Sequence, residues 1–377
     1  MSLYRVPPVG NRLPLKGLLN KTIDFDEIFS NYTPFFLDSG TSALAIAINQ
    51  AKKSFPGKTE IIIPAYTCPD VISAIYYAEC TPVLVDFVKD KPFLNLEDLD
   101  DLITENTLAI IAINFLGLQE QITSIRSKIS RRKILIIEDS AQSAPWRNKS
   151  HLLGDLAILS FGRGKPESVL SGGAVLVSNE LSLENPVEIP LIESGSTLSS
   201  ALYALKVIIY NILLSPIAFS LICKIPQLKI GETIFHPLVQ TRTMPLFAKR
   251  MLSFQIKNRK TNKNISRYIH ESLKNLANKK IVDLPFACDW DQNTELLRYP
   301  ILLPTEKIKR TLVQTLANVG VSEMYPTVLP NIVGLDQLSK KDYPNALDFS
   351  NRLITLPCHR HVKQAAIDKI MSELEKL

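Results

Sequence analysis

The sequence predicts an α/β fold with a mostly parallel sheet, followed by a smaller α+β domain. Between residues 60 and 161, short apolar runs alternate with amphipathic helical segments, which is typical of strand–helix–strand units with parallel strands. The runs contain few polar residues, as expected of strands that are buried on both faces. Polar residues directly follow several of these runs, at the edge where open α/β sheets bind their ligands.

The composition is that of an ordinary globular enzyme. The chain has 377 residues, of which 46% are hydrophobic and 21% charged, and its net charge is +6. No Lys/Arg run exceeds a few residues, so we expect no nucleic-acid partner. The five cysteines lack zinc-type spacing and do not form a disulfide framework, so we expect no metal site and a reducing cytoplasm. Arg5, Arg12 and two prolines interrupt the N-terminal stretch, which argues against a signal peptide.

The first part of the chain predicts an irregular arm and a helix start that can bind an anion. Residues 1–33 contain three prolines and one short helical stretch near residues 25–29. A short strand then ends at Gly40, and an alanine-rich helix begins at Thr41 or Ser42. The first N–H groups of a helix are unpaired and attract anions. The alternative is an ordinary Ser/Thr N-cap without a ligand.

The central region provides the strands and helices of the sheet domain. No G-x-G-x-x-G follows a strand, so a dinucleotide-binding site is not supported. We expect strands at 60–64, 82–86, 108–114, 134–139 and 156–161, and helices at 71–78, 96–103 and 122–130.

Two of these strands end in residues that fit pyridoxal phosphate (PLP). The strand 134–139 is followed by Ser140, Ala141 and Gln142, and the strand 156–161 by a glycine-rich turn that contains Lys165. An amine for a Schiff base, a carboxylate for the ring nitrogen and donors for a phosphate are what PLP requires. Alone, Lys165 would be taken for a surface lysine and Asp139 for a capping residue. Their combination with Gln142 and Ser160 favours the cofactor site.

Residues 201–225 form an unusually apolar stretch, which Pro216 should divide into two helices. Its apolar side chains need an environment that shields them from water, and three are considered. Burial in the core or in a subunit interface is favoured, a hairpin on a membrane surface comes second, and a membrane-spanning helix comes last. The polar residues that interrupt the stretch are Lys206, Asn211, Ser215, Ser220 and Lys224.

The C-terminal part predicts a compact α+β domain. We expect a long polar helix over 251–276, which includes Arg259, and then a strand at 297–303. A helix at 307–319, an apolar run at 353–357 and a last helix at 363–377 complete it. The expected organisation is a large domain over 1–245, with a divergent apolar insert at about 196–230, and a small domain over 246–377.

Several motifs, in order, resemble those of the DegT/StrS-type sugar-nucleotide aminotransferases, which are PLP enzymes of fold type I with a seven-stranded sheet. The N-terminal half matches specifically, the C-terminal domain more loosely, and residues 186–245 do not match well. The similar motifs are SGTSALAIAI (39–48), IIIPAYTCPDVISAIYYAECTPVLVDF (61–87), IIEDSAQS (136–143), GDLAILSFGRGK (154–165), SGGAVLVSN (171–179) and YPNALDFSNRLITLPCH (343–359).

The resemblance implies roles for individual residues. Lys165 would be the catalytic residue that binds the cofactor covalently, and Asp139 would pair with the ring nitrogen. Gln142 would lie near the phenolate oxygen, and Ser160 and the backbone at Thr41 and Ser42 would hold the phosphate. The implied cofactor-binding set is Gly40, Thr41, Ser42, Cys68, Asp139, Gln142, Ser160 and Lys165.

Three positions depart from the family pattern. Cys68 stands where the family has an aromatic ring stacked on the cofactor, and Tyr66 has the wrong strand parity to replace it. Ser171 stands where the family has a glutamate. The family's arginine that reaches the neighbouring subunit's phosphate has no clear counterpart, and Arg242 or Arg163 is the candidate.

The expected activity is transamination of a nucleotide-linked keto-sugar, with an amino acid donor such as glutamate, in polysaccharide or related amino-sugar biosynthesis. We expect a cytoplasmic homodimer. Peripheral contact with the inner membrane through residues 201–225, where Lys206, Lys224 and Lys229 would face lipid headgroups, is the alternative. The competing hypotheses are a sugar dehydratase, against which Lys165 argues because related dehydratases have histidine there, and a non-catalytic binding or scaffold protein. The sequence does not identify the sugar.

Overall fold

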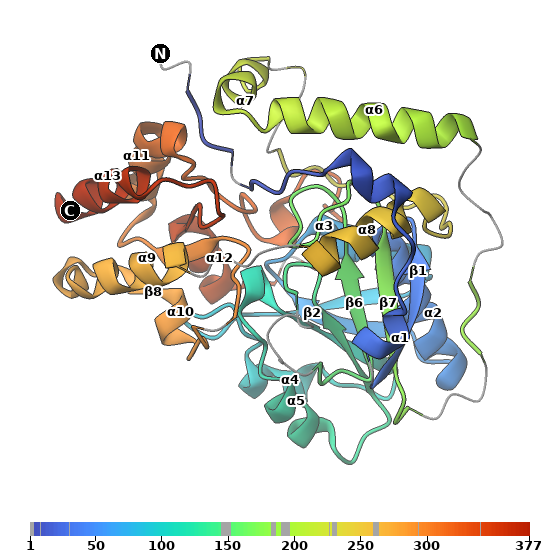
Figure 1. Cartoon of the computed structure of the whole chain (residues 1–377). Coiled ribbons are helices and arrows are strands. Elements are labelled where there is room, and N and C mark those ends of the chain that lie inside the picture. The colour runs from blue at the N-terminus through green and yellow to red at the C-terminus, as the bar shows by residue number, and fades with distance from the viewer. Residues whose placement is uncertain are drawn as a thin grey trace.

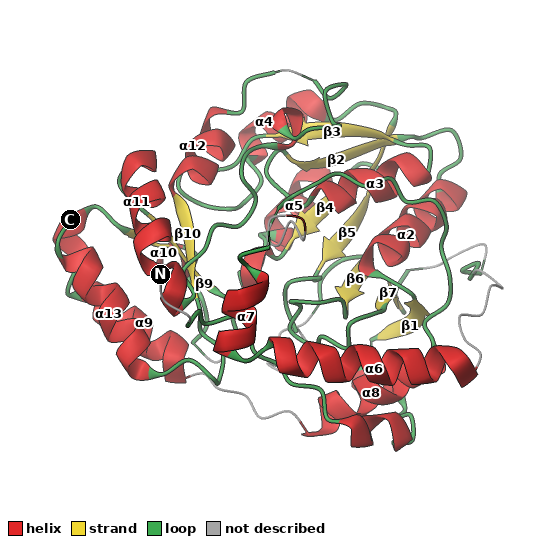
Figure 2. Cartoon of the chain, turned by 90° about the horizontal axis from the view of Figure 1, so that it is seen from above, coloured by secondary structure: helices red, strands yellow, loops and turns green. Residues whose placement is uncertain are grey.

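A computed structural model describes residues 4–7, 9–29, 31–144, 152–181, 186–189, 197–225, 227, 232–258, 264–292, 294–339 and 341–377. The large domain surrounds a central sheet, and the smaller C-terminal domain lies beside it (Figure 1). Seen from above, the helices α6 and α8 lie along one side of the sheet domain (Figure 2).

The large sheet has seven strands in the order β1-β7-β6-β5-β4-β2-β3. Only β7 runs antiparallel to its neighbours, β1 and β6. The expectation of a mostly parallel sheet is therefore confirmed. The sequence pattern did not predict the antiparallel direction of β7. The strands are β1 Tyr32–Leu37, β2 Glu60–Pro64, β3 Thr81–Val85, β4 Thr107–Ile113, β5 Leu135–Asp139, β6 Leu156–Ser160 and β7 Gly173–Ser178.

Alternate residues of the central strands face opposite helix layers, because side chains of a strand point to its two faces in turn. Ile61 and Ile63 pack in the cluster that includes α2 (Gly40–Ser54) and α3 (Pro69–Tyr77). Ile62 packs in the cluster that includes α4 (Leu96–Leu102) and α5 (Ile122–Ile129). Both faces are thus covered, which explains why these strands are apolar throughout.

A third layer covers the β1–β7–β6 end of the sheet. It consists of η1 (Leu15–Leu19), α1 (Phe25–Ile28), α6 (Thr197–Leu213) and α8 (Leu246–Asn258). The apolar stretch divides as expected: α6 is followed by α7 (Pro216–Ile222), whose N-terminus is capped by Ser215.

Residues 201–225 were expected to be buried, and the structure buries only one face of α6. The inner face of α6 is buried through Tyr203 and Val207, whereas its outer face exposes large aliphatic side chains. Among the described residues, no single helix is both long and apolar enough to cross a membrane, and α6 and α7 meet that requirement only as a pair bent by 100°. The exposed aliphatic residues of the two helices and their end are Leu202, Leu205, Ile208, Ile209, Ile212, Ile217, Leu221 and Ile225.

The C-terminal domain is α+β, as expected. Its antiparallel sheet has the order β10-β9-β8. The predicted single helix over 251–276 is wrong: α8 ends at Asn258, α9 begins at Asn264, and Arg259 lies outside the described residues. The elements are α9 Asn264–Lys274, β8 Val282–Asp283, α10 Leu284–Ala287, β9 Tyr299–Leu302, α11 Glu306–Leu316, η6 Ala317–Val319, α12 Pro344–Arg352, β10 Leu353–Leu356 and α13 Gln364–Glu375.

The domain boundary near residue 245 remains a prediction. Ala248 and Met251 of α8 are buried in the same cluster as Leu159 of β6. Helix α8 therefore packs with the large domain, although it follows the expected boundary in the sequence.

Candidate active site

A cavity of about 420 Å³ lies where the carboxyl ends of the central strands meet the first turn of α2. It collects residues from Asp38 to Gly172, because parallel strands deliver their ends to one edge of a sheet. Seven of the eight residues expected for the cofactor line it: Gly40, Thr41, Cys68, Asp139, Gln142, Ser160 and Lys165.

The first turn of α2 forms one wall. The helix begins at Gly40, one residue before the expected start, and Ser39 caps it by accepting a hydrogen bond of 3.0 Å from the Ser42 N–H. Ser42 also bonds to Ser39 through its hydroxyl, and it does not line the cavity. The N–H groups of Gly40 and Thr41 lie in the first turn, where they have no intrahelical acceptor.

Gly40 is required by the close approach of the next strand. A Cβ atom at this position would lie 2.8 Å from Cβ and 2.9 Å from Oγ of Ser160. The helix start and the end of β6 are therefore in contact, and their polar groups face the same end of the cavity.

Asp139 and Lys165 supply opposite charges to the cavity. Asp139 is the last residue of β5, and its Oδ1 accepts a hydrogen bond of 2.9 Å from the Ala141 N–H. Burial raises the pKa of Asp139, while this hydrogen bond and the nearby Lys165 ammonium lower it in part. Lys165 follows Gly164, whose φ of +77° shapes the turn. A buried carboxylate thus shares the cavity with the only lysine among its lining residues.

The side chain of Gln142 is fixed at both ends. Its Oε1 accepts a hydrogen bond of 2.9 Å from the Leu116 N–H, and its Nε2 donates one of 2.8 Å to the Tyr325 hydroxyl. Tyr325 belongs to the small domain and also lies against the Cys68 thiol. Sequence reasoning missed Tyr325, since nothing in the local pattern shows a contact that spans 183 residues.

Cys68 lies at the start of α3 and lines the cavity. Burial, and secondarily the carboxylate of Asp70, raises the pKa of Cys68 to about 12, so it is a neutral thiol near pH 7. Tyr66 does not take the place of the missing aromatic ring: it is buried in the core, and its hydroxyl donates to the Tyr325 carbonyl oxygen.

Of the two candidate phosphate arginines, only Arg163 lines the cavity, where it is exposed. The other, Arg242, is directed to the Gln240 side chain, so it is not a cavity residue in this chain. Ser171, which stands where the related family has a glutamate, donates to the Asp38 carbonyl oxygen at 3.3 Å.

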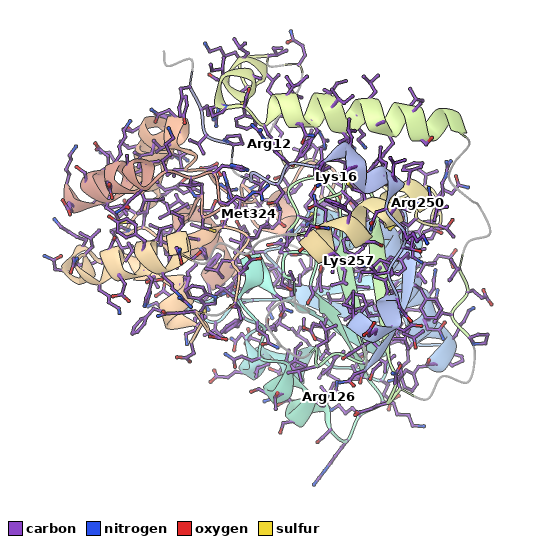
Figure 3. The ribbon with its side chains drawn as sticks, in the orientation of Figure 1. Arg12, Lys16, Arg126, Arg250, Lys257 and Met324 are labelled. Atoms are coloured by element: carbon purple, nitrogen blue, oxygen red, sulfur yellow. The ribbon has the colours of Figure 1, made fainter. Side chains whose placement is uncertain are left out.

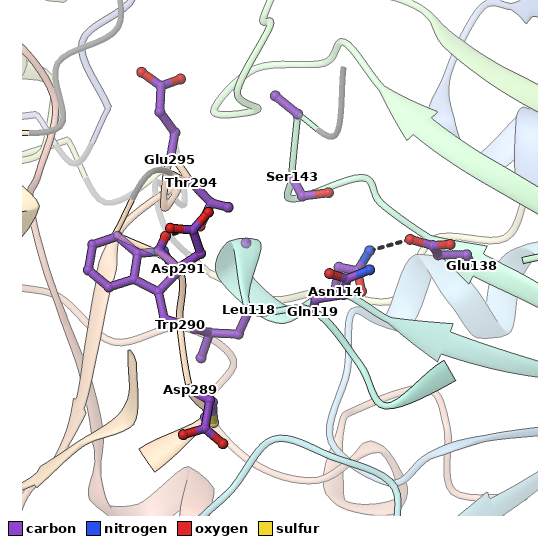
Figure 4. A pocket seen from close by; sticks show the side chains of 13 residues that line it. Asn114, Leu118, Gln119, Glu138, Ser143, Asp289, Trp290, Asp291, Thr294 and Glu295 are labelled. Atoms are coloured by element: carbon purple, nitrogen blue, oxygen red, sulfur yellow. Dashed lines mark hydrogen bonds between the residues drawn. The ribbon is translucent and has the colours of Figure 1, made fainter. Parts of the chain in front are cut away.

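A second cavity nearby, of about 150 Å³, has a different character (Figure 4). It lies between the β4–β5 end of the sheet and the loop 288–295 of the small domain. Glu138, which accepts a hydrogen bond from Asn114, lines it together with Asp289, Asp291 and Glu295. No lysine or arginine is among its lining residues, so it suits an anionic phosphate poorly.

A model of the DegT/DnrJ/EryC1/StrS aminotransferase family matches residues 24–190 and 249–375. The unmatched middle includes α6 and α7, in the region where the sequence shows little resemblance. GDP-perosamine synthase of Caulobacter vibrioides is 32% identical over 167 residues, which are 42% of this chain and 44% of that protein. The alignments cover less than half the length of the curated relatives.

Solved structures agree on the fold. Helicobacter pylori PseC, an aminotransferase involved in the biosynthesis of pseudoaminic acid, has a TM-score of 0.70 and 16% identity over 99% of this chain and 98% of that one. Escherichia coli GDP-4-keto-6-deoxy-D-mannose-3-dehydratase, solved with bound hydrated PLP, has a TM-score of 0.70 and 14% identity over 99% of this chain and 100% of that one. The expected fold type I is confirmed, and the cofactor of the second neighbour agrees with the expectation of PLP.

Proposed function

Because the chain belongs to the DegT/DnrJ/EryC1/StrS aminotransferase family, we propose that it transfers an amino group from an amino acid such as glutamate to a nucleotide-linked keto-sugar, with PLP as cofactor. The observation that carries this proposal is the cavity that unites Lys165, Asp139 and the first turn of α2. An amine, a buried carboxylate and unpaired N–H groups are the donors and acceptors that PLP requires. When bound, PLP supplies an electron sink for the carbanion formed at the donor's α-carbon.

Each residue then has a defined task. Lys165 binds the cofactor covalently and, once released, moves the proton at the α-carbon. Asp139 accepts a charge-assisted hydrogen bond from the ring nitrogen and keeps it protonated. Ser160 and the N–H groups of Gly40 and Thr41 bind the phosphate. Their geometry supports this task, since Gly40 and Ser160 are already in contact.

Two residues at the side of the cavity orient rather than react. Gln142 cannot rotate freely, because Leu116 and Tyr325 use both ends of its amide. Cys68, a neutral thiol with a pKa of about 12, offers a smaller contact surface than an aromatic ring and is not a nucleophile near pH 7. We therefore assign both residues to cofactor positioning.

Borohydride reduction tests the proposal directly. Purified protein with PLP should show a visible absorbance band that disappears on reduction, and peptide mapping should find the reduced cofactor on Lys165. Lys165→Ala should lose the band, the label and transamination, whereas Lys307→Ala, an exposed lysine of α11, should keep all three. A label on another lysine would overturn the assignment.

The dehydratase hypothesis predicts a different readout. One structural neighbour is a dehydratase, but we favour transamination because this chain has Lys165 where related dehydratases have histidine. Glutamate added to the PLP-loaded protein should yield one equivalent of 2-oxoglutarate for each cofactor. A protein that releases none, yet eliminates water from a nucleotide keto-sugar, would be a dehydratase. A protein that does neither and retains no PLP would be a binding or scaffold protein.

We further propose a homodimer that works in the cytoplasm, in polysaccharide or related amino-sugar biosynthesis. In the related family a partner subunit contributes to the phosphate site, and Arg163 is the arginine that lines the cavity here. Sedimentation velocity of the PLP-loaded protein tests the dimer, and a screen of nucleotide keto-sugars tests the substrate class.

A further inference from the structure

A larger cavity, of about 720 Å³, shares no lining residue with the candidate active site. The N-terminal arm, the α7 region and the small domain form its three walls. The arm is tied to both other walls, because the Arg5 N–H donates to the Pro216 carbonyl and the Val6 N–H to the Asn318 carbonyl. Arg5, Phe219 and residues 232–234 lie outside the matched family segments. Two of the three walls therefore belong to parts of the chain that the family model does not match.

The third wall contains an arginine for which the described part of the chain supplies no hydrogen-bond partner at two of its nitrogens. Arg298 is 7% exposed, and its Nε and Nη2 atoms are buried without a hydrogen bond. These two nitrogens form one edge of the guanidinium, the fork that binds a carboxylate or phosphate with two parallel hydrogen bonds.

The ionisable groups nearest to this arginine are the Cys358 thiol, which donates to the Leu296 carbonyl oxygen and, against the larger effect of burial, raises the pKa of Arg298, and the His359 ring. Burial lowers the pKa of His359 to about 4, so its ring is neutral near pH 7. The neutral ring donates from Nε2 to the Pro7 carbonyl and accepts at Nδ1 from the His361 N–H. Burial lowers the pKa of Arg298 itself to about 10, which leaves it cationic near pH 7.

The two carboxylates that line the cavity do not pair with Arg298 either. Glu323 lies 3.4 Å from the Lys309 ammonium, and Glu232 is exposed. Arg5 adds a second cation, which lies over the Phe219 ring. A buried charge without a partner is costly, so the cavity is expected to take an anion from outside the chain.

The remaining surface of the cavity is mostly apolar, and one of its members, Met324, lies on the side of the small domain that faces the N-terminal arm (Figure 3). Helix α7 provides Phe219 to the cavity and exposes Ile217 and Leu221 beside it. Neither α6 nor α7 contains an acidic residue. The cavity therefore lies next to exposed aliphatic side chains of α7.

Three side-chain hydrogen bonds tie helix α6 to the body of the protein. The Tyr203 hydroxyl, Lys206 Nζ and Asn211 Nδ2 donate to the carbonyl oxygens of Val169, Leu170 and Leu13. Lys206 is an exposed residue whose ammonium donates to the Leu170 carbonyl oxygen, and the expectation that it faces lipid headgroups remains a prediction. Lys229 lies outside the described residues, and Lys224 is exposed. A helix that is held in this way can contact a membrane surface with its exposed aliphatic face while it stays attached to the protein.

We propose that this cavity binds the phosphate of an anionic lipid at Arg298, with the acyl chains along the outer face of α6 and α7. Binding requires the guanidinium fork to turn into the cavity. A second copy of the chain is a poorer candidate for covering the outer face of α6 and α7. In a symmetric dimer the same two helices of each copy would meet. Because neither helix contains an acidic residue, such a pairing would bring no carboxylate from these helices to Arg298.

Vesicle sedimentation of the PLP-loaded protein tests this site. The wild type should sediment with vesicles of phosphatidylcholine and phosphatidylglycerol, and not with phosphatidylcholine alone. Arg298→Gln should weaken this binding by roughly tenfold or more, since it removes a charge-assisted fork, and Arg298→Lys should restore part of it. Arg310→Gln is the matched control, because Arg310 is exposed on α11 and pairs with Glu306.

A second variant keeps the test independent of the folding of Arg298→Gln. Leu205→Asp with Ile212→Asp changes two exposed side chains of α6 and should also release the protein from vesicles, with its cofactor band unchanged. Arg298-dependent binding of soluble pyrophosphate without vesicle binding would overturn the lipid assignment. A wild-type dimer that ignores vesicles and becomes monomeric in the double variant would overturn it in favour of a second copy. Transamination is measured separately, so its failure does not affect this result.

Discussion

The Gln142 amide donates a 2.8 Å hydrogen bond to the Tyr325 hydroxyl, and this bond joins the edge of the large sheet to the small domain. The same hydroxyl lies against Cys68. The wall of the candidate active site is therefore continuous across the two domains, and the orientation of a large-domain amide depends on a small-domain side chain.

Removal of this hydroxyl should loosen the cofactor site. In Tyr325→Phe the Gln142 Nε2 becomes a buried donor without its acceptor, which costs about 1–3 kcal/mol. We expect a lower melting temperature and weaker PLP retention, measured by thermal scanning and by dialysis against buffer. Tyr76→Phe is the control, because the Tyr76 hydroxyl only accepts a long bond of 3.4 Å from Gln337. Unchanged PLP retention in Tyr325→Phe would remove Tyr325 from the site.

Asp139→Asn should stabilise the cofactor-free protein while it impairs the reaction. Burial raises the pKa of Asp139, so at pH 7 the ionised carboxylate lowers folding stability, and a neutral amide removes that cost while it still accepts from Ala141. A lost charge-assisted bond of about 1.5–3 kcal/mol corresponds to a roughly 10- to 100-fold slower transamination. Melting curves and single-turnover rates measure the two effects. An Asp139→Asn variant that is less stable and equally active would contradict both expectations. The control is Asp70→Asn, at an exposed carboxylate of the same cavity, which should change neither the stability nor the rate strongly.

Gly40→Ala should separate the helix start from β6. The new Cβ would lie 2.8 Å from the Ser160 Cβ, and overpacking of this kind costs about 1–3 kcal/mol. We expect weaker PLP binding, measured by fluorescence titration. Gly162→Ala meets only the Ser160 Oγ, at 3.7 Å, and should have a smaller effect. Equal losses in the two variants would mean that this contact does not shape the phosphate site.

Glu120 should make the free energy of unfolding fall as pH rises from 4.5 to about 7. Burial raises its pKa from 4.5 to about 7, so between these values the folded state binds more protons than the unfolded state. The unfolding free energy then decreases by about 3 kcal/mol from pH 4.5 to 7 and changes no further above that range. The difference between the urea midpoints of wild type and Glu120→Gln should therefore depend on pH within this window. The exposed Glu97→Gln should follow the wild type, and a constant difference across the window would contradict the prediction.

The sequence predicted the parts of the fold that depend on local pattern. Strand β2 was expected and found at residues 60–64, and Pro216 divides α6 from α7 as expected. The helix over 251–276 was wrong, because polar periodicity alone does not show where one helix ends and the next begins. Seven of the expected cofactor residues line one cavity, because strand ends and the helix starts that follow them lie at one edge of the sheet, and their roles remain predictions.

Contacts between distant segments could not be predicted in this way. Tyr325 reaches Gln142 through the docking of the small domain, and the hydrogen bond from the Lys206 ammonium to the Leu170 carbonyl depends on how α6 packs. The lack of hydrogen-bond partners at Nε and Nη2 of Arg298 depends on how three separate segments pack around its cavity. Each of these depends on tertiary packing, about which an unaligned sequence contains no direct signal.

The position of β1 at the edge of the sheet also has a consequence for the order of folding. Its ladder partner is β7, from Tyr32↔Ser178 to Leu37↔Gly173, so the first strand to be synthesised pairs with the last strand of the large sheet. Contacts of such long sequence separation form slowly, because the loop between them must close first. During synthesis, β1, which precedes the first turn of α2, therefore cannot complete its ladder until residue 178 has left the ribosome.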